Sequence, residues 1–93
     1  MAVGVLRVKL RLYGVKTLKQ RRSVVEPLLT RARREFNVSA AELVPPSEPE
    51  VAVLGFAHLS NNGGFSDQVL KGLLRNLDGD RAFCVEDWEI EVF

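Results

Sequence analysis

Cysteine and long apolar runs are scarce in this sequence, and each scarcity excludes a class of protein. Cys84 is the only cysteine, so neither an internal disulfide nor a cysteine-built metal site can form, and a reducing compartment is expected. No apolar run approaches the ~18 residues that a membrane-spanning helix needs. The first residues lack the basic and apolar segments of a secretion signal, so we expect a cytoplasmic protein that does not enter a membrane.

Acidic residues are scarce in the first part of the chain, and basic residues are scarce in the rest. The first 36 residues hold ten lysines and arginines against two acids, and the rest of the chain holds three against ten, although the net charge is only +1. Such asymmetry indicates nucleic-acid contact or pairing between the two halves. The 93 residues suffice for a single domain, residues 1–93, with one modest core.

Periods of two and of 3.6 residues alternate along the chain and predict six elements in the order β-α-β-β-α-β. They are a strand at 3–13, a helix at 18–36, strands at 37–44 and 51–59, a helix between the turn at 60–64 and residues 78–80, and a strand at 82–93. Right-handed crossovers convert this order into a ferredoxin-like split βαβ fold of the α+β class. Its four-stranded antiparallel sheet has the order 4-1-3-2, with both helices on one face.

Prolines occur at two places in the chain where they disfavour regular helix or strand structure. Pro27 lies inside the first predicted helix, opposite an apolar stripe, so we expect a kink on the solvent side rather than a break. That stripe is formed by Leu18, Val25, Leu28, Leu29, Ala32 and Phe36. The prolines at 45, 46 and 49 predict a stiff loop that joins no strand ladder.

The topology explains part of the charge asymmetry. The first and last strands are neighbours, and their outward residues carry opposite charges: Arg7, Lys9 and Arg11 on one, Asp87, Glu89 and Glu91 on the other. Facing pairs of this kind contribute ~0.2–1 kcal/mol each. Pairing between strands therefore accounts for the basic stripe of the first strand more simply than nucleic-acid binding, and for the acids more simply than a metal site.

Four segments of the sequence are similar to the YlxP-like family of bacterial proteins. They start at Val3-Gly4-Val5-Leu6, Thr17-Leu18-Lys19-Gln20-Arg21, Phe36-Asn37-Val38-Ser39 and Ser60-Asn61-Asn62. The resemblance implies a ferredoxin-like, cytoplasmic protein without an established biochemical activity. It also implies a gene often found near those for translation initiation and ribosome maturation factors. Gln20, the proline loop and Asn62 depart from the family pattern, which has acidic residues there and an aromatic in the loop.

The remaining basic residues are the most informative feature of the sequence. They cluster in the turn before the first helix and on its exposed side, where only Glu26 and Glu35 balance them. Lysine and arginine contacts to phosphate give salt-dependent affinity without sequence recognition, so structured RNA or the ribosome is one candidate partner. A merely solvated helix face is the alternative. The candidate nucleic-acid-binding residues are Lys16, Lys19, Arg21, Arg22, Arg31, Arg33 and Arg34.

An enzyme is the weakest hypothesis, because no catalytic constellation is recognisable. His58 has no evident partner beyond Ser60 and is interpreted as structural, and Cys84 as a buried, inert thiol. The turn Asn61, Asn62, Gly63 and Gly64 could offer backbone N–H groups to an anion, but it lacks the lysine of a phosphate-binding loop. No metal, cofactor or small-molecule substrate is predicted.

The strand at 51–59 is apolar on both sides, so one side lies on the uncovered sheet face. If Ala52, Leu54 and Phe56 pack inward, an aliphatic strip of Val51, Val53, Ala57 and Leu59 points out; the reverse assignment exposes Phe56. Exposed apolar surface of this kind usually marks an interface. We therefore predict a homodimer or a hetero-complex that covers this strand. Edge pairing through the strand at 37–44 is the competing assembly.

Overall fold

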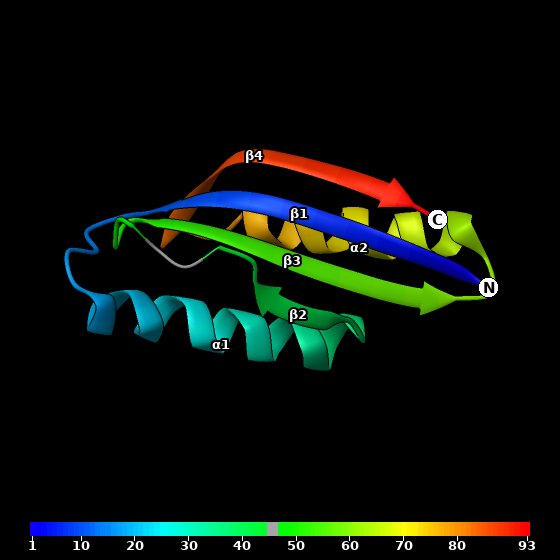
Figure 1. The fold of residues 1–93 in the computed structure, drawn as a ribbon, viewed down its shortest axis with the longest axis horizontal. Helices are drawn as coiled ribbons and strands as arrows, with labels where there is room; N and C mark the ends of the chain where they lie inside the picture. The colour runs from blue at the N-terminus through cyan, green and yellow to red at the C-terminus, as the bar shows by residue number, and fades with distance from the viewer. Residues whose placement is uncertain (45–46) are drawn as a thin grey trace.

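Six elements follow one another in the order that the sequence predicts (Figure 1). A computed structural model describes residues 1–44 and 47–93. The elements are β1 (Ala2–Leu12), α1 (Leu18–Phe36), β2 (Ser39–Glu42), β3 (Val51–Ser60), α2 (Gly63–Asp78) and β4 (Phe83–Val92). The bounds of α1 match the prediction, and β2 is shorter than the strand expected at 37–44. Residues 45–46 of the predicted proline loop lie outside the described residues.

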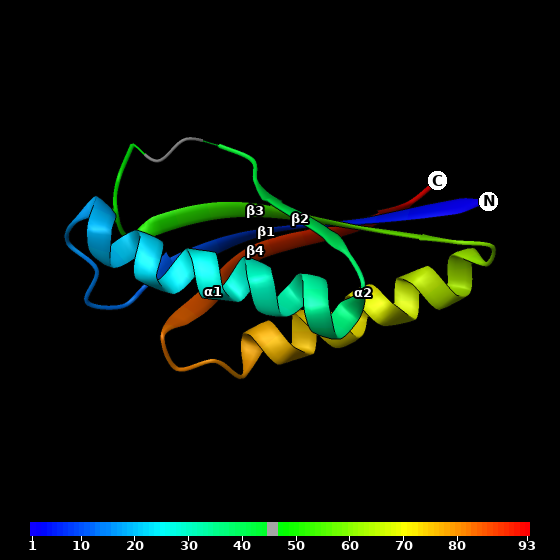
Figure 2. The same ribbon diagram turned by 90° about the horizontal axis from the view of Figure 1, so that it is seen from below.

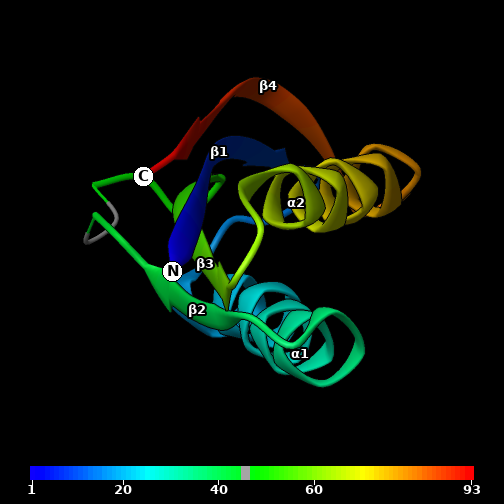
Figure 3. The same cartoon turned by 90° about the vertical axis from the view of Figure 1, so that its right-hand side faces the viewer.

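The four strands form one antiparallel sheet of order β2-β3-β1-β4. This is the predicted order 4-1-3-2 read from the opposite edge. Figure 2 shows the sheet from its side with both helices beneath it, and Figure 3 shows α1 on the β2 side and α2 on the β4 side. The ferredoxin-like α+β fold is therefore confirmed.

The hydrophobic core fills the layer between the sheet and the helices. Every second residue of β1, from Ala2 to Leu12, points into this layer and is buried, as period two requires. Ala52, Leu54 and Phe56 of β3 also point inward, so the first of the two assignments for this strand is correct. The helices contribute Val25, Leu28, Leu29 and Ala32 from α1 and Leu70, Leu73 and Leu77 from α2.

The two ends of α1 are capped by side chains and by a left-handed residue. Thr17 and Gln20 form a reciprocal capping box, in which Thr17 Oγ1 accepts the Gln20 N–H at 3.1 Å. Asn37 ends the helix with a φ of 52°. The helix runs through the exposed Pro27 without being split. Leu18 was expected in the apolar stripe, but at the first residue of α1 it is 63% exposed.

A one-residue bulge in β4 changes the predicted pairing of charges. The register passes from Lys9–Asp87 to Leu10–Val85, so Glu86 is the extra residue. Its carboxylate pairs with Arg11 and lies 3.8 Å from Lys9 Nζ. Arg7 pairs with Glu89 at 3.6 Å, as the facing stripes predict. The expected charge pairing of Asp87 with the basic residues of β1 is corrected, because the bulge brings the Glu86 carboxylate to Lys9 and Arg11 instead.

The chain beyond β2 folds back over the outer face of the sheet. Leu43 N–H donates to the Val53 carbonyl at 2.8 Å, and the Leu43 side chain then lies over Gly55. A Cβ added at Gly55 would lie 2.8 Å from Leu43 Cδ2, closer than such atoms approach. Glycine at this position therefore allows one apolar side chain to cover the middle of β3.

Candidate functional site

Arg21 does not belong to the exposed basic surface. Its side chain is buried, and the residue is only 5% exposed. The guanidinium bonds the Glu42 carboxylate and donates to the Val51 carbonyl at 3.3 Å from two of its nitrogens. It thereby ties α1 to β2 and to the start of β3, and burial lowers the pKa of the group. Its assignment as a nucleic-acid contact is corrected, since its donors are used within the chain.

Two further arginines of α1 are partly engaged by their own chain. Arg31 lies 3.7 Å from Asp80 and donates to Asn76 Oδ1, so it joins α1 to the end of α2. Arg33 donates to the Ala40 carbonyl of β2 at 2.7 Å. Among the described residues, four of the seven predicted cations have exposed side chains that make neither an ion pair nor a hydrogen bond: Lys16, Lys19, Arg22 and Arg34.

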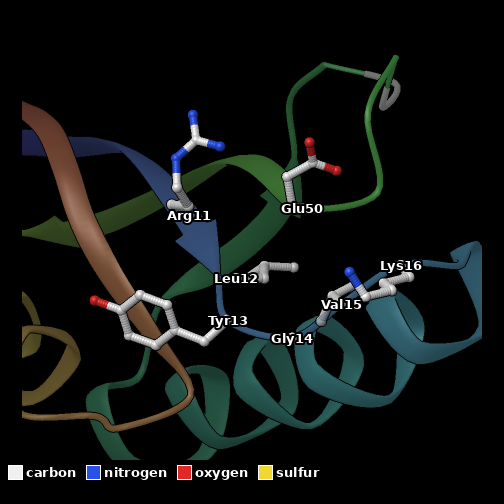
Figure 4. Close-up of a pocket in the computed structure, with 7 residues that line it drawn as sticks. All are labelled: Arg11, Leu12, Tyr13, Gly14, Val15, Lys16 and Glu50. Carbon is white, nitrogen blue, oxygen red and sulfur yellow. The ribbon is translucent and has the colours of Figure 1, made fainter.

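Lys16 borders a hollow of about 490 Å³ where β1 turns into α1 (Figure 4). In Figure 4 the side chains of Arg11 and Glu50 project to the same side of this hollow, and the Tyr13 ring points towards β4. The turn is closed by Gly14, whose φ of +69° is left-handed. Because Arg11 is paired with Glu86, Lys16 supplies the unpaired cation of this hollow.

A buried chain of polar side chains joins the end of β3 to α2, and nothing in the sequence signalled it. His58 Nδ1 lies 2.9 Å from Ser66 Oγ, which lies 2.6 Å from Ser60 Oγ, and the Ser60 hydroxyl donates to the Asn62 carbonyl. His58 and Ser66 are both buried, so the cluster stabilises the fold, as predicted for His58, and is closed to a substrate.

The turn at Asn61, Asn62, Gly63 and Gly64 caps the start of α2. Asn62 Oδ1 accepts the Phe65 N–H at 3.0 Å, and the Asn62 carbonyl accepts the Ser66 N–H. Asn62 therefore takes the N–H groups of Phe65 and Ser66 in the first turn of α2. The anion-binding assignment of this turn stays a prediction.

Within residues 1–44 and 47–93, no helix covers the outer face of the sheet, and the face is apolar at one end (Figure 2). Along β3, Val51, Val53 and Ala57 are half-buried on this face and Leu59 is exposed, in the orientation that the inward packing of Phe56 predicts. At the end near the termini, Leu59 pairs with Val3, and Val3 exchanges two backbone hydrogen bonds with the exposed Phe93. We call this the apolar end of the outer face; it comprises Val3, Val5, Ala57, Leu59 and Phe93.

Cys84 is half-buried on the outer face, opposite Arg11. The prediction of a buried Cys84 thiol is therefore wrong. Its strand lies at the sheet edge, so only one side of it is flanked. The thiol beside Tyr13 raises the pKa of that phenol above its usual value.

Comparison with known proteins decides the family. The model of the family described as "Protein of unknown function (DUF503)" matches residues 3–90. The chain belongs to the DUF503 family. A search of curated proteins gives no match for this DUF503 chain. Along the described part of the chain, no helix is long and apolar enough to cross a membrane.

Solved structures similar to the DUF503 chain agree on its fold. The de novo designed protein Foldit4 superposes with a TM-score of 0.54 at 18% identity, covering 98% of this chain and 96% of the other. A point mutant of SnoaB, a cofactor-independent oxygenase from Streptomyces nogalater, gives 0.53 at 15% identity, covering 99% and 90%. At such identities the similarity concerns the fold alone and does not extend to the function of either protein.

Proposed function

We propose that this protein is a non-enzymatic, cytoplasmic accessory factor that binds structured RNA, free or in the ribosome, through phosphate contacts of α1. The observation that carries the proposal is the set of four exposed cations whose side chains make no ion pair or hydrogen bond among the described residues, Lys16, Lys19, Arg22 and Arg34. The YlxP-like resemblance, with which the family match is compatible, supports the same interpretation through its association with translation genes.

The four cations extend from the turn before α1 to its last turn. A helix of 19 residues is roughly 28 Å long, so cations at its first and last turns can reach well-separated phosphates. Lys19 and Arg22 lie on the flank that borders β2, where Arg33 also reaches the Ala40 carbonyl. Arg34 lies nearer the middle of the exposed side. Binding by backbone contacts alone recognises the shape and charge of an RNA and not its sequence.

The expected signature is a steep salt dependence. Four phosphate contacts predict a slope of about −3 to −4 in a plot of log affinity against log salt concentration. We would measure co-sedimentation with ribosomal particles, and filter binding to a structured RNA, at two salt concentrations. Replacing Lys16, Lys19, Arg22 and Arg34 by glutamine should abolish most of the binding and flatten the slope.

A matched control separates these contacts from net charge. Lys71, Arg75 and Arg81 lie on α2 and in the loop after it, so replacing these three by glutamine lowers the net charge without touching α1. The comparison uses the triple variant Lys19→Gln, Arg22→Gln and Arg34→Gln, which removes the same charge. Equal losses in both triple variants, or unchanged binding in the α1 variant at low salt, would contradict the proposal.

The non-enzymatic part of the proposal is supported by the burial of the most reactive-looking cluster. The His58–Ser66 pair has the composition of a base and a nucleophile, but Ser66 is fully buried. A nucleophile has to reach the substrate atom that it attacks. The Ser66 hydroxyl, held between two partners, is positioned to stabilise the junction of β3 and α2.

A second candidate function is self-assembly, and the apolar end of the outer face favours it. Leu59 is 63% and Phe93 72% exposed there. Three strands of about ten residues span a face of roughly 33 by 15 Å, or ~500 Å² before side chains are added. A standard interface buries ~800 Å² per partner, so a two-fold dimer through this face would have to bury neighbouring charged residues, such as Arg7 and Glu89, together with the apolar end.

Two equally exposed leucines test the dimer. Leu59 on the outer face and Leu18 at the start of α1 are both 63% exposed. If two outer faces pack together, Leu59→Lys should shift sedimentation equilibrium towards the monomer, and Leu18→Lys should leave it unchanged. A wild-type protein that stays monomeric at high micromolar concentration would remove this candidate.

A further inference from the structure

The edge of β4 carries unused backbone groups. β4 is the last strand of the sheet, and β1 pairs with only one of its sides. Val3 and Phe93 exchange both of their hydrogen bonds, so in the antiparallel alternation Glu91 and Glu89 also point their backbone groups at β1. The backbone groups of the residues between them, Ile90 and Val92, point away from the sheet.

The two halves of this edge differ in accessibility. The first half is protected, since the bulge at Glu86 interrupts its regular spacing and the Asp87 carboxylate accepts the Trp88 N–H at 2.9 Å. From the Trp88 carbonyl to Val92 the strand is regular. In the described part of the chain, no strand pairs with this side of it.

The side chains flanking the regular half differ in chemistry between the two faces. On the outer face it presents Glu89 and Glu91, with Asp87 at its start. On the inner face Trp88 is 51% exposed and borders a hollow of about 210 Å³ between β4 and α2. Leu74 and Val85 form the apolar wall of that hollow. A strand added here would meet carboxylates with one set of side chains and an indole with the other.

The chain itself shows which kind of strand pairs with β4. β1 alternates basic and aliphatic residues, and its Arg7 lies 3.6 Å from Glu89 while Val8 lies opposite Trp88. A second copy of β4 would be a poor partner, because its carboxylates would oppose those at positions 87, 89 and 91 across the new pair. A second segment with the β1 pattern meets opposite charges on one face and apolar surface on the other.

We propose that the free edge of β4, from Trp88 to Val92, is a docking site for an extended basic peptide segment of a partner protein. The segment adds to the sheet as a fifth strand. Its lysines or arginines lie beside Glu89 and Glu91, and its alternate apolar residues lie against Trp88 and Leu74. Backbone hydrogen bonds to Ile90 and Val92 hold it in register.

Trp88 makes the docking directly measurable, because it is the only tryptophan of the chain. The probe is a capped peptide of sequence Lys-Val-Lys-Leu-Lys-Val, titrated into the full-length protein. We expect Trp88 emission to move to shorter wavelength with saturation, as the half-exposed indole is covered. The same peptide with glutamates in place of the lysines should leave the emission unchanged. Binding detected by peptide anisotropy without a change in Trp88 emission would overturn the proposal.

Two further comparisons separate strand addition from simple charge attraction. Glu91→Lys should weaken peptide binding about tenfold, whereas Glu35→Lys, the same charge reversal at the end of α1, should change it less than about twofold. A peptide methylated on every internal backbone nitrogen keeps its charge and loses its donors, and it should bind at least about tenfold more weakly. Equal effects of the two reversals, or full binding of the methylated peptide, would refute docking at this edge.

Discussion

The inner and outer faces of the same sheet obey different rules. On the inner face every second residue of β1 is buried against two helices, and β3 contributes Leu54 and Phe56 to the same layer. On the outer face the same strands carry exposed ion pairs, such as Arg7–Glu89, and an uncovered apolar end. Stability is therefore concentrated on one face, and the other face is left free to bind.

The contrast also separates two kinds of polar interaction. Polar groups at the border of the inner layer, such as Arg21 and Ser66, are buried, so losing a partner leaves a desolvated group unsatisfied. Ion pairs of the outer face are solvated and contribute about 0–1 kcal/mol each. The four predictions that follow test this difference, from the largest expected effect to the smallest.

Truncating a leucine should be costly on one face and cheap on the other. Leu54 is fully buried, and Leu59, five residues later in the same strand, is largely exposed. Leu54→Ala should lower the free energy of unfolding by about 2–5 kcal/mol, since it leaves a cavity. Leu59→Ala should change it by less than about 0.5 kcal/mol in the monomer. Urea unfolding of both variants at low protein concentration provides the measurement; equal losses would contradict the comparison.

Neighbouring arginines of α1 should respond very differently to the loss of their charge. Arg21→Gln leaves the Glu42 carboxylate and the Val51 carbonyl without their partner, so we expect a loss of about 2–3 kcal/mol. Arg22→Gln, on the exposed flank, should cost less than about 0.5 kcal/mol. Thermal unfolding of the two variants measures this difference. An Arg21→Gln protein as stable as the wild type would show that this buried arginine is dispensable.

The polar chain at the end of β3 should be sensitive to a single hydroxyl. Ser66→Ala removes the group between His58 Nδ1 and Ser60 Oγ and should lower the free energy of unfolding by about 1–2 kcal/mol. Ser23→Ala is the matched control, because the Ser23 hydroxyl only returns to the Lys19 carbonyl on the surface of α1. Similar denaturation midpoints for the two variants would argue against a structural role for the chain.

The smallest effect is expected from an ion pair of the outer face. Arg11 holds the pKa of the Glu86 carboxyl below its ordinary value of 4.5. A carboxyl with a lowered pKa in the folded state stabilises the protein above its unfolded pKa, and this stabilisation is lost as the pH falls through the folded value. NMR titration should therefore place the Glu86 midpoint below 4.5, and Arg11→Gln should raise it. An unchanged midpoint in that variant would show that Arg11 is not the cause.

Periodicity in the sequence was enough to predict the fold and most side-chain orientations. Helix α1 was predicted residue for residue, and the inward assignment of Phe56 predicted which residues of β3 lie outside. Arg21 was misplaced because a charged residue was assumed to be exposed, although Val25 and Leu28, at i+4 and i+7, put it on the buried side of the helix.

Other features of the site lay beyond sequence reasoning. A bulge inserts one residue without altering the composition of a strand, so nothing distinguished Glu86 from its neighbours before the register with β1 was known. Ser66 becomes the partner of His58 only when α2 docks onto the end of β3. The seven candidate cations divide into engaged and free ones only through contacts with β2, β3 and the end of α2.

The bulge in β4 also determines where this chain tolerates a change in length. Because no residue of β1 lies opposite Glu86 in the register, deleting it would join Val85 directly to Asp87 and leave both Leu10–Val85 and Lys9–Asp87 paired. Every side chain of β4 would keep its face, whereas a deletion elsewhere in the strand would turn the residues beyond it over. Relatives one residue shorter should therefore carry their gap here, and their last strand should be straighter and more prone to self-association.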